Sequence, residues 1–198
     1  MISAFIGSPG SGKSTAAAWI ARRAIQRPNK PIRVCGQCIS SGHANVVTNF
    51  DFPGAFKLHW DLLGKTQIED ALIIIDEIML LADSRDFKSY SKDIKFFMSQ
   101  HRKYNCDILW MSQAYDDVDK KIRNLTTKYF LLSPFIFDFY CLTAIDHFVD
   151  IVDYQIVSGY EFGRKQYFWG RPIYKLFDSF DTVNVEKEMR PYPLEFWG

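Results

Sequence analysis

The stretch GSPGSGKST, residues 7–15, decides the fold class of this chain. Two of its glycines are separated by four residues, and a lysine and a serine follow the second glycine directly. An apolar run (2–6) precedes the stretch, and a run rich in helix formers (14–26) continues from it. A G-x-x-x-x-G-K-[ST] pattern between a strand and a helix is typical of a phosphate-binding loop, the P-loop.

Each part of this pattern has a physical task in binding a polyphosphate. Glycines bring backbone N–H groups close to phosphate oxygens, and the helix that follows adds the positive end of its dipole. Lys13 supplies a point charge for the β- and γ-phosphates, and the Ser14 hydroxyl is a ligand for Mg²⁺. The pattern therefore predicts a nucleoside triphosphate with Mg²⁺. The predicted nucleotide-binding residues are Gly7, Ser8, Pro9, Gly10, Ser11, Gly12, Lys13, Ser14 and Thr15.

Polar residues that end two apolar runs predict hydrolysis of this nucleotide. The run LIIIDE (72–77) is continuously apolar up to Asp76 and Glu77, as in a strand buried on both faces. Beside a P-loop, Asp76 is expected to hold Mg²⁺ through water, and Glu77 to orient or deprotonate the attacking water. The next such run, CDILWMSQ (106–113), ends in Gln113, whose amide is expected to position that water.

Two arginines are candidates for stabilising charge on the γ-phosphate. Phosphoryl transfer is accelerated by an arginine that reaches this phosphate, often from a neighbouring subunit. The candidates are Arg102 in HRKY (101–104) and Arg123 in KKIRNL (120–125). Each of these arginines could equally be a solvated or ion-paired surface residue, so the sequence leaves open which of the two contacts the γ-phosphate.

Composition and charge restrict the class of protein. The chain has 198 residues, of which 47% are hydrophobic, and this suits a globular domain with a sizeable core. Its net charge of +1 means that any nucleic-acid contact must come from a local patch. No apolar run reaches the ~18 residues that a membrane span needs, and the first residues lack the pattern of a secretory signal. We therefore expect a cytoplasmic protein with no transmembrane segment of its own.

The chain contains four cysteines: Cys35, Cys38, Cys106 and Cys141. The first two have C-x-x-C spacing, and His43 is close in sequence. A zinc site would need a second matched pair, and a redox motif would begin a helix, whereas IRVCGQCI (32–39) is interpreted as one strand with a glycine kink. We expect small buried side chains rather than a metal or redox site.

Strand and helix patterns alternate over most of the chain, which implies parallel βαβ units. Apolar residues at helical spacing predict a helix within 84–104, whereas 40–56 is interpreted as mostly loop with one short strand, and 58–66 could form another strand. From about residue 151, short aromatic runs separated by glycine and proline predict antiparallel hairpins. We predict an α/β fold with a mainly parallel central sheet flanked by helices. A single domain spans 1–198, with a nucleotide-binding core (1–135), a C-terminal β-rich addition (136–184) and an extended tail (185–198).

Four stretches, in this order and at these spacings, resemble the zonular occludens toxin (Zot) family: GSPGSGKST, LIIIDE, QHRKYNCDILWMSQ and KKIRNLTTKYFLLS. The closing IYKLFDSFDTVN (173–184) is similar to the habitual end of that family. The family includes the assembly ATPases of filamentous phages and belongs to the FtsK/HerA branch of additional-strand RecA-like P-loop ATPases. The resemblance matches residues 7–15 with the phosphate loop, Asp76 and Glu77 with its acidic pair, Gln113 with its sensing amide and Arg102 with its "HR" arginine. It implies subunits that form a homo-oligomeric ring, with ATP bound between neighbours and hydrolysis coupled to DNA movement or virion export.

One departure from the family shifts the expected function. Its filamentous-phage members carry a transmembrane segment after the ATPase domain, and none is found here. Compact members of this branch without such a segment typically package DNA into capsids of tailless viruses. The resemblance therefore favours a viral genome-packaging ATPase in the host cytoplasm. A Zot-type phage assembly and export ATPase at a membrane partner is the alternative, and capsid or membrane-embedded assembly proteins are possible partners.

Two loops could contact DNA phosphates without reading sequence. The candidate contacts are Arg85, Lys88, Lys92, Arg164, Lys165 and Arg171. Aromatic residues lie between Arg164, Lys165 and Arg171 and could stack on bases, although packing within a hairpin explains these aromatic residues equally well. A small-molecule kinase is a weaker hypothesis because no arginine-rich lid is present, and a GTPase would need an Asn-Lys-x-Asp-like guanine reader, which is absent.

Overall fold

The computed structural model describes residues 1–58, 68–78, 92–152 and 155–176. Its strands are β1 (Ile2–Ile6), β2 (Ile32–Val34), β3 (Gln37–Ser40), β4 (Asn45–Thr48), β5 (Phe56–Lys57), β6 (Ala71–Ile75), β7 (Cys106–Ser112), β8 (Lys128–Pro134), β9 (Phe139–Val152) and β10 (Gln155–Trp169). Its helices are α1 (Lys13–Gln26), α3 (Lys92–Gln100), α4 (Lys120–Leu125) and α5 (Arg171–Tyr174).

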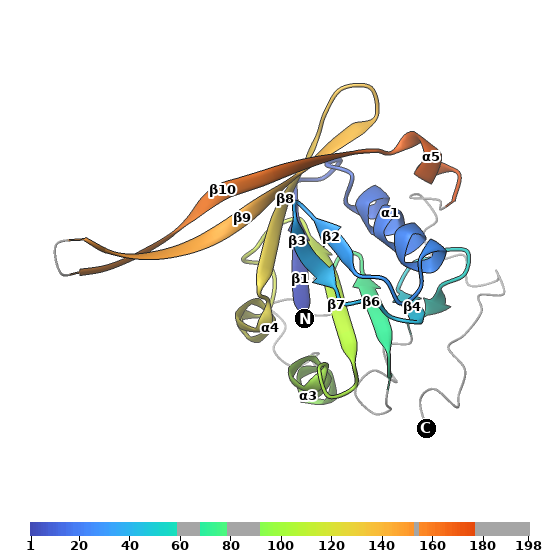
Figure 1. Cartoon of the computed structure of the whole chain (residues 1–198), viewed down its shortest axis with the longest axis horizontal. Helices are drawn as coiled ribbons and strands as arrows, with labels where there is room; N and C mark the ends of the chain where they lie inside the picture. The colour runs from blue at the N-terminus through green and yellow to red at the C-terminus, as the bar shows by residue number, and fades with distance from the viewer. Residues whose placement is uncertain (59–67, 79–91, 153–154, 177–198) are drawn as a thin grey trace.

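Eight strands form one sheet in the order β10-β9-β8-β1-β7-β6-β4-β5 (Figure 1). The six strands from β8 to β5 are parallel, whereas β9 and β10 run antiparallel to their neighbours. Strand β7 lies between β1, which leads into the P-loop, and β6, which ends at the acidic pair. This inserted strand is the mark of the additional-strand RecA-like class, so the predicted fold class is confirmed.

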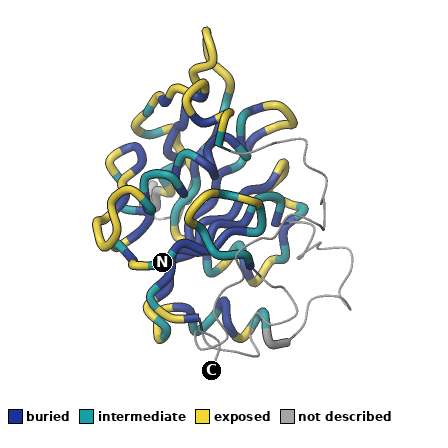
Figure 2. The backbone as a smooth tube through the Cα atoms, turned by 90° about the vertical axis from the view of Figure 1, so that its right-hand side faces the viewer, coloured by how far each residue is buried: buried dark blue, intermediate teal, exposed yellow. Residues whose placement is uncertain are grey.

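Both faces of the central sheet are covered, and alternate residues of β6 divide between two cores. Leu72 and Ile74 pack with α1 and with the β2–β3 hairpin. Ile73 and Ile75 face the opposite core, to which α3 and α4 contribute. This alternation follows from the two-residue period of a strand, and it explains why β6 is apolar throughout. Figure 2 shows the buried strands at the centre of the molecule.

The prediction of one kinked strand over residues 32–39 is wrong. Strands β2 and β3 form a tight antiparallel hairpin in which Val34 pairs with Gln37. The two residues between them, Cys35 and Gly36, have φ of +52° and +82°. Positive φ at both central residues makes the type I′ turn that matches the twist of a hairpin. The glycine therefore reverses the chain instead of bending a continuous strand.

The carboxy-terminal strands are longer than the sequence suggested. Instead of several short strands from about residue 151, β9 and β10 form a single hairpin of 14 and 15 residues that projects from the sheet (Figure 1). Its base continues the sheet because β9 pairs with β8, from Tyr129 opposite Ile145 to Pro134 opposite Tyr140. We name this hairpin the arm.

Several predictions fall partly on residues that the structure does not describe. The helix expected within 84–104 is present as α3, and 84–91 lies outside the described residues. Residues 59–66 of the predicted strand at 58–66 also lie outside them, as does the tail 185–198. Within 40–58, the segment interpreted as mostly loop supplies two short parallel strands, β4 and β5.

Candidate nucleotide-binding site

The P-loop connects β1 to α1 at the carboxyl edge of the parallel strands. The Gly7 N–H donates to the carbonyl oxygen of Ser112 at 3.2 Å, and this bond ties the start of the loop to the end of β7. Gly12 has φ of +91°, and a Cβ built on it would lie 2.2 Å from the ring of Tyr140 in β9. Glycine is therefore required at position 12 by the backbone angle and by the aromatic ring. Sequence analysis did not identify Tyr140, because no local pattern links β9 to the P-loop.

Lys13 carries a buried ammonium group surrounded by oxygen acceptors. The residue is 6% exposed. Its Nζ donates to the carbonyl oxygens of Gly7 (3.0 Å) and Ser8 (3.2 Å) and lies 3.5 Å from Oε1 of Glu77. A buried charge is tolerated only with such partners. The ammonium group is thus held between the loop and the acidic end of β6.

Asp76 is fixed by Asn49, which sequence analysis missed. Asn49 Nδ2 donates to the backbone carbonyl of Asp76 (2.7 Å), and Asn49 Oδ1 accepts from the backbone N–H of Asp76 (2.8 Å). Burial raises the pKa of the Asp76 carboxyl and outweighs a side-chain hydrogen bond with Ser14, which lowers it. The charge of Glu77 raises the pKa further. The available clue was that Asn49 directly follows β4, because carboxyl ends of parallel strands meet at one edge.

Glu77 adopts a left-handed backbone conformation, with φ of +52°. Such a conformation is uncommon for a residue with a side chain, and examples cluster at functional sites. Its Oε1 accepts a hydrogen bond from Gln113 Nε2 at 3.3 Å and also faces Lys13. The next residue, Ile78, donates its N–H to the carbonyl of Met111 (2.9 Å), so the turn at Glu77 returns the chain to β7. The structure brings Lys13, Glu77 and Gln113 together from three elements.

The carboxylate oxygens at this edge fit a divalent cation. Asp76 Oδ1 and Glu77 Oε2 are buried, and neither has a hydrogen-bond partner among the described residues. Mg²⁺ prefers oxygen ligands and keeps several waters, so one or two carboxylates with a hydroxyl suffice. Ser14, already bonded to Asp76, supplies that hydroxyl. In the part of the chain that the structure describes, no cluster of three or more His, Cys, Asp or Glu side chains offers another metal site.

The structure does not bring either predicted arginine to the P-loop of its own chain. Arg102 is exposed in the turn after α3, at the amino end of β7, whereas Gln113 follows the carboxyl end. The seven residues of β7 separate these ends by about 20 Å. Arg123, near the end of α4, pairs with Asp116 at 2.7 Å, and its guanidinium lies 4.6 Å from the ring centroid of Tyr115.

The basic residues predicted to contact DNA are dispersed over the fold. Arg85 and Lys88 lie outside the described residues, and Lys92 is the first residue of α3. Arg164 and Lys165 are exposed in β10, and Arg171, also exposed, begins α5. The predicted phosphate and water-activating residues therefore converge, whereas Arg164, Lys165 and Arg171, the described DNA candidates with placed side chains, lie on other elements.

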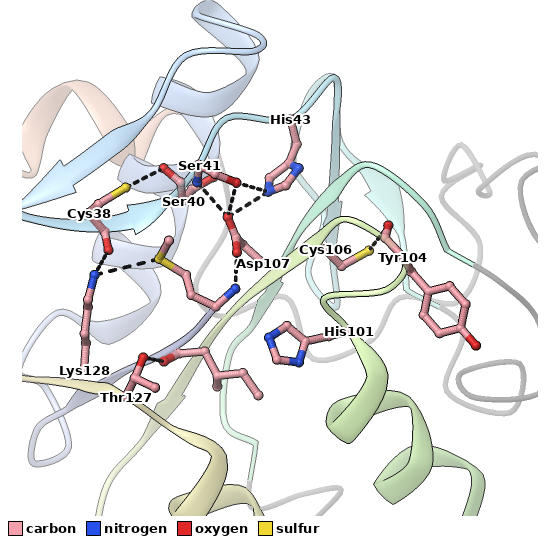
Figure 3. A network of polar contacts seen from close by, with 12 residues as sticks. Cys38, Ser40, Ser41, His43, His101, Tyr104, Cys106, Asp107, Thr127 and Lys128 are labelled. Atoms are coloured by element: carbon pink, nitrogen blue, oxygen red, sulfur yellow. Dashed lines mark hydrogen bonds and ion pairs between the residues drawn. The ribbon is translucent and has the colours of Figure 1, made fainter.

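A second polar network surrounds Asp107 at the opposite, amino edge of the sheet (Figure 3). Asp107 Oδ2 lies 2.8 Å from His43 Nε2 and accepts from the N–H and the hydroxyl of Ser41, while Oδ1 binds the Met1 amine. His43 Nδ1 lies 3.2 Å from Asp70 Oδ1. Burial lowers the pKa of His43, but the two carboxylates outweigh it and raise the pKa overall. Burial raises the pKa of Asp107, but its hydrogen-bond donors, His43 first, hold that pKa well below its usual range.

The cysteines act as packed side chains in the described structure. All four are free thiols. The Cys35 thiol donates to the carbonyl of Leu142, and burial raises its pKa to about 11. The Cys106 thiol donates to the carbonyl of Ile68, and burial raises its pKa to about 12. Both thiols are therefore protonated at neutral pH.

Comparison with models of known protein families identifies the family of this chain. The family model "Zonular occludens toxin (Zot)" matches residues 1–134, more than half of the chain. The chain belongs to the Zot family. The resemblance inferred from the four sequence stretches is therefore confirmed, and the match ends at the last residue of β8, so that it includes the P-loop, the acidic pair and Gln113.

Solved structures are similar to this Zot-family chain at low sequence identity. The crystal structure of the N-terminal domain of zonular occludens toxin from Neisseria meningitidis has a TM-score of 0.52 and 17% identity, over 89% of this chain and 98% of that chain. The genome packaging NTPase B204 from Sulfolobus turreted icosahedral virus 2, in complex with ATP-gammaS, has a TM-score of 0.46 and 10% identity, over 79% and 95%. Among curated proteins, no sequence matches the chain. Within the described residues, no helix of this Zot-family protein has the length and apolar character of a membrane span.

Proposed function

We propose that this Zot-family protein is an ATP-hydrolysing motor that moves DNA, and that it packages a viral genome. The observation that carries the proposal is the convergence of Lys13, Glu77 and Gln113 at the P-loop. Nucleotide hydrolysis needs a cation for the phosphates, a carboxylate that accepts a proton and a group that positions water. These three side chains would supply those functions, and Glu77 lies within ion-pairing distance of Lys13 and hydrogen-bonding distance of Gln113.

Each residue has a distinct role in the proposed reaction. Backbone N–H groups of residues 7–15 and the Lys13 ammonium group bind the β- and γ-phosphates. The Glu77 carboxylate accepts a proton from the attacking water, and the Gln113 amide orients that water. Mg²⁺, which Ser14 and Asp76 would hold, supplies positive charge that stabilises the phosphate oxygens.

The active unit in this proposal is a homo-oligomeric ring. Arg102 is exposed at the edge of the sheet opposite its own P-loop, so it can reach a γ-phosphate only in a neighbouring subunit. Arg123 is the second candidate, although Asp116 and Tyr115 already hold its guanidinium. Arg102, Lys13, Glu77 and Gln113 are the proposed catalytic residues.

DNA is the proposed partner, contacted through its phosphates by basic residues on two segments. The first segment holds Arg85, Lys88 and Lys92, and the second holds Arg164, Lys165 and Arg171. The family match itself favours a second candidate function, an assembly and export ATPase that acts on virion DNA at a membrane partner. The two functions share the ATPase site and differ in what stimulates it.

Steady-state ATP hydrolysis, measured with and without double-stranded DNA, tests the proposal. We expect DNA to accelerate hydrolysis, and Glu77→Gln to reduce kcat by about 100-fold or more while ATP still binds. Lys13→Ala should lose ATP binding. Glu69→Gln is the matched control, because this exposed carboxylate lies at the far edge of the sheet, just before β6. Undiminished turnover in Glu77→Gln would contradict the assigned chemistry, and hydrolysis that DNA does not change would favour the export function.

A further inference from the structure

The first quarter of the chain has only basic charges. Residues 1–50 contain no aspartate or glutamate. Their lysines and arginines are Lys13, Arg22, Arg23, Arg27, Lys30 and Arg33. Except for Lys13 in the P-loop, these residues lie on the second half of α1, in the loop after it and in β2. This segment therefore has no counter-charges of its own and creates a local positive potential that the net charge of the whole chain hides.

Two of these arginines meet at the turn of the β2–β3 hairpin. Arg33 Nη1 donates to the carbonyl oxygen of Gly36 at 3.2 Å, and Arg23 Nη1 lies 3.5 Å from the carbonyl oxygen of Arg33. The Arg23 guanidinium also lies 4.9 Å from the ring centroid of Trp19, which stacks on Phe168 of β10 at 4.6 Å. Backbone carbonyls and an aromatic ring therefore orient both guanidinium groups.

A β-bulge in the arm brings a third arginine to the same turn. The register of β9 and β10 shifts between Phe162 and Lys165, where Gly163 and Arg164 oppose a single residue of β9. A Cβ built on Gly163 would lie 2.0 Å from Oδ2 of Asp146, so a larger residue there would have to displace that carboxylate. Within the bulge, Arg164 Nη1 lies 3.1 Å from the position that a Cβ on Gly36 would take. Bulges re-aim side chains, and this one directs Arg164 onto the β2–β3 turn.

No carboxylate of the described residues neutralises Arg23, Arg33 and Arg164, which we name the arginine patch. Among the described residues, no Asp or Glu oxygen lies within 4.0 Å of their guanidinium nitrogens. The acid near the bulge, Asp146, instead accepts from Gln37 Nε2 at 2.6 Å. Burial lowers the pKa of Arg23, and the charge of Arg27 lowers it further. Like charges that gather without counter-ions are stabilised by an external anion.

We propose that the arginine patch binds the phosphodiester backbone of nucleic acid. Guanidinium groups match phosphate oxygens with two parallel donors, and contacts of this kind hold a nucleic acid without reading its sequence. A membrane surface fits less well because the aromatic residues beside the patch, Trp19 and Phe168, stack on each other and Phe168 is buried. The inference rests on the proposed DNA-moving function. It places the DNA contact on the surface where α1, the β2–β3 hairpin and the arm meet (Figure 1).

Salt-dependent DNA binding by the full chain tests the arginine patch. A fluorescein-labelled 30-base-pair duplex would be titrated by anisotropy over a range of NaCl concentrations, with Arg33→Gln/Arg164→Gln, Arg33→Lys/Arg164→Lys and wild type. Loss of two phosphate contacts should reduce the slope of log K against log[salt] by about 1.8 and weaken binding about 60-fold at 0.1 M salt. The lysine pair should keep the slope.

A charge-matched control separates the patch from general electrostatics. Lys120→Gln/Lys121→Gln removes two exposed charges from α4, on the opposite face of the sheet, and should leave the slope intact. The inference would be overturned if the control lost as much salt slope as the arginine-to-glutamine pair, or if that pair kept the wild-type slope. Either result would leave the motor proposal standing. Wild-type protein that binds no duplex, or that binds only vesicles containing phosphatidylserine, would overturn both.

Discussion

Replacing Gly12 by alanine tests the contact between the P-loop and Tyr140. Alanine at this position meets two separate obstacles. The backbone has φ of +91°, and a Cβ would lie 2.2, 2.4 and 2.9 Å from three carbons of the Tyr140 ring. That ring cannot move freely, because it stacks on Phe168 at 5.3 Å and its hydroxyl lies 2.9 Å from that of Tyr174.

The two obstacles have different magnitudes and can be separated. Positive φ costs an alanine about 1–2 kcal/mol. Overpacking against a held aromatic ring adds about 1–3 kcal/mol. Gly10 provides the matched control, since its φ of +76° imposes a similar backbone cost while nothing lies within 4 Å of a Cβ built there. Gly12→Ala should therefore lose more free energy of unfolding than Gly10→Ala.

A double-mutant cycle with Tyr140→Ala, followed by urea unfolding and tryptophan fluorescence, measures the steric contribution. Removing the ring should reduce the cost of Gly12→Ala by about 1–3 kcal/mol, down to the cost of Gly10→Ala. The cost of Gly10→Ala should be the same with and without the ring. If Gly12→Ala costs the same in both backgrounds, the ring does not constrain the P-loop, and the reasoning fails.

Two further predictions concern contacts that sequence analysis did not predict. Asn49→Ala should lower the free energy of unfolding by about 1–3 kcal/mol, because two hydrogen bonds to the Asp76 backbone are lost. It should also lower kcat by about 10- to 100-fold, because Asp76 shifts. An unchanged kcat in the ATPase assay would refute the positioning role of Asn49. The network around His43 should stabilise the fold most between about pH 4 and 6.5. The pKa of His43 is raised on folding, so the stability that His43 contributes is lost as pH rises through that pKa. The pKa of Asp107 is lowered on folding, so the stability that Asp107 contributes is lost as pH falls below the pKa of Asp107 in the unfolded chain. Urea unfolding at a series of pH values checks this, and a His43→Asn variant with the same alkaline decline would exclude His43 as the cause.

Local patterns were sufficient for the parts of the site that are contiguous in sequence. The P-loop is a nine-residue pattern with its own strand and helix context, and Asp76, Glu77 and Gln113 each end an apolar run. Because parallel strands end at the same edge of a sheet, these patterns also predicted that the groups would meet. The structure places Lys13, Glu77 and Gln113 within 3.5 Å contacts, as that argument requires.

Contacts between elements far apart in the chain could not be predicted in this way. The Cys35–Gly36 turn was interpreted as a kink because hydrophobic periodicity does not distinguish a bent strand from a tight hairpin of very short strands. Asn49 clamps Asp76, 27 residues away, and Tyr140 covers Gly12 from 128 positions further along the chain. No local preference encodes such pairs, because their energies arise only once the sheet has assembled.

The sequence by itself predicted the phosphate-binding loop and its chemistry, since these follow from residue types at fixed short spacings, whereas the additional-strand class was implied by the family resemblance and is visible only in the strand order. Only the tertiary structure decided which distant side chains support that chemistry and where opposing or like charges meet. Arg33 and Arg164 illustrate the difference: they are 131 positions apart, and a bulge at Gly163 and Arg164 brings them to one turn. The physical reason is that strand order and register, not local preference, set which side chains share a surface.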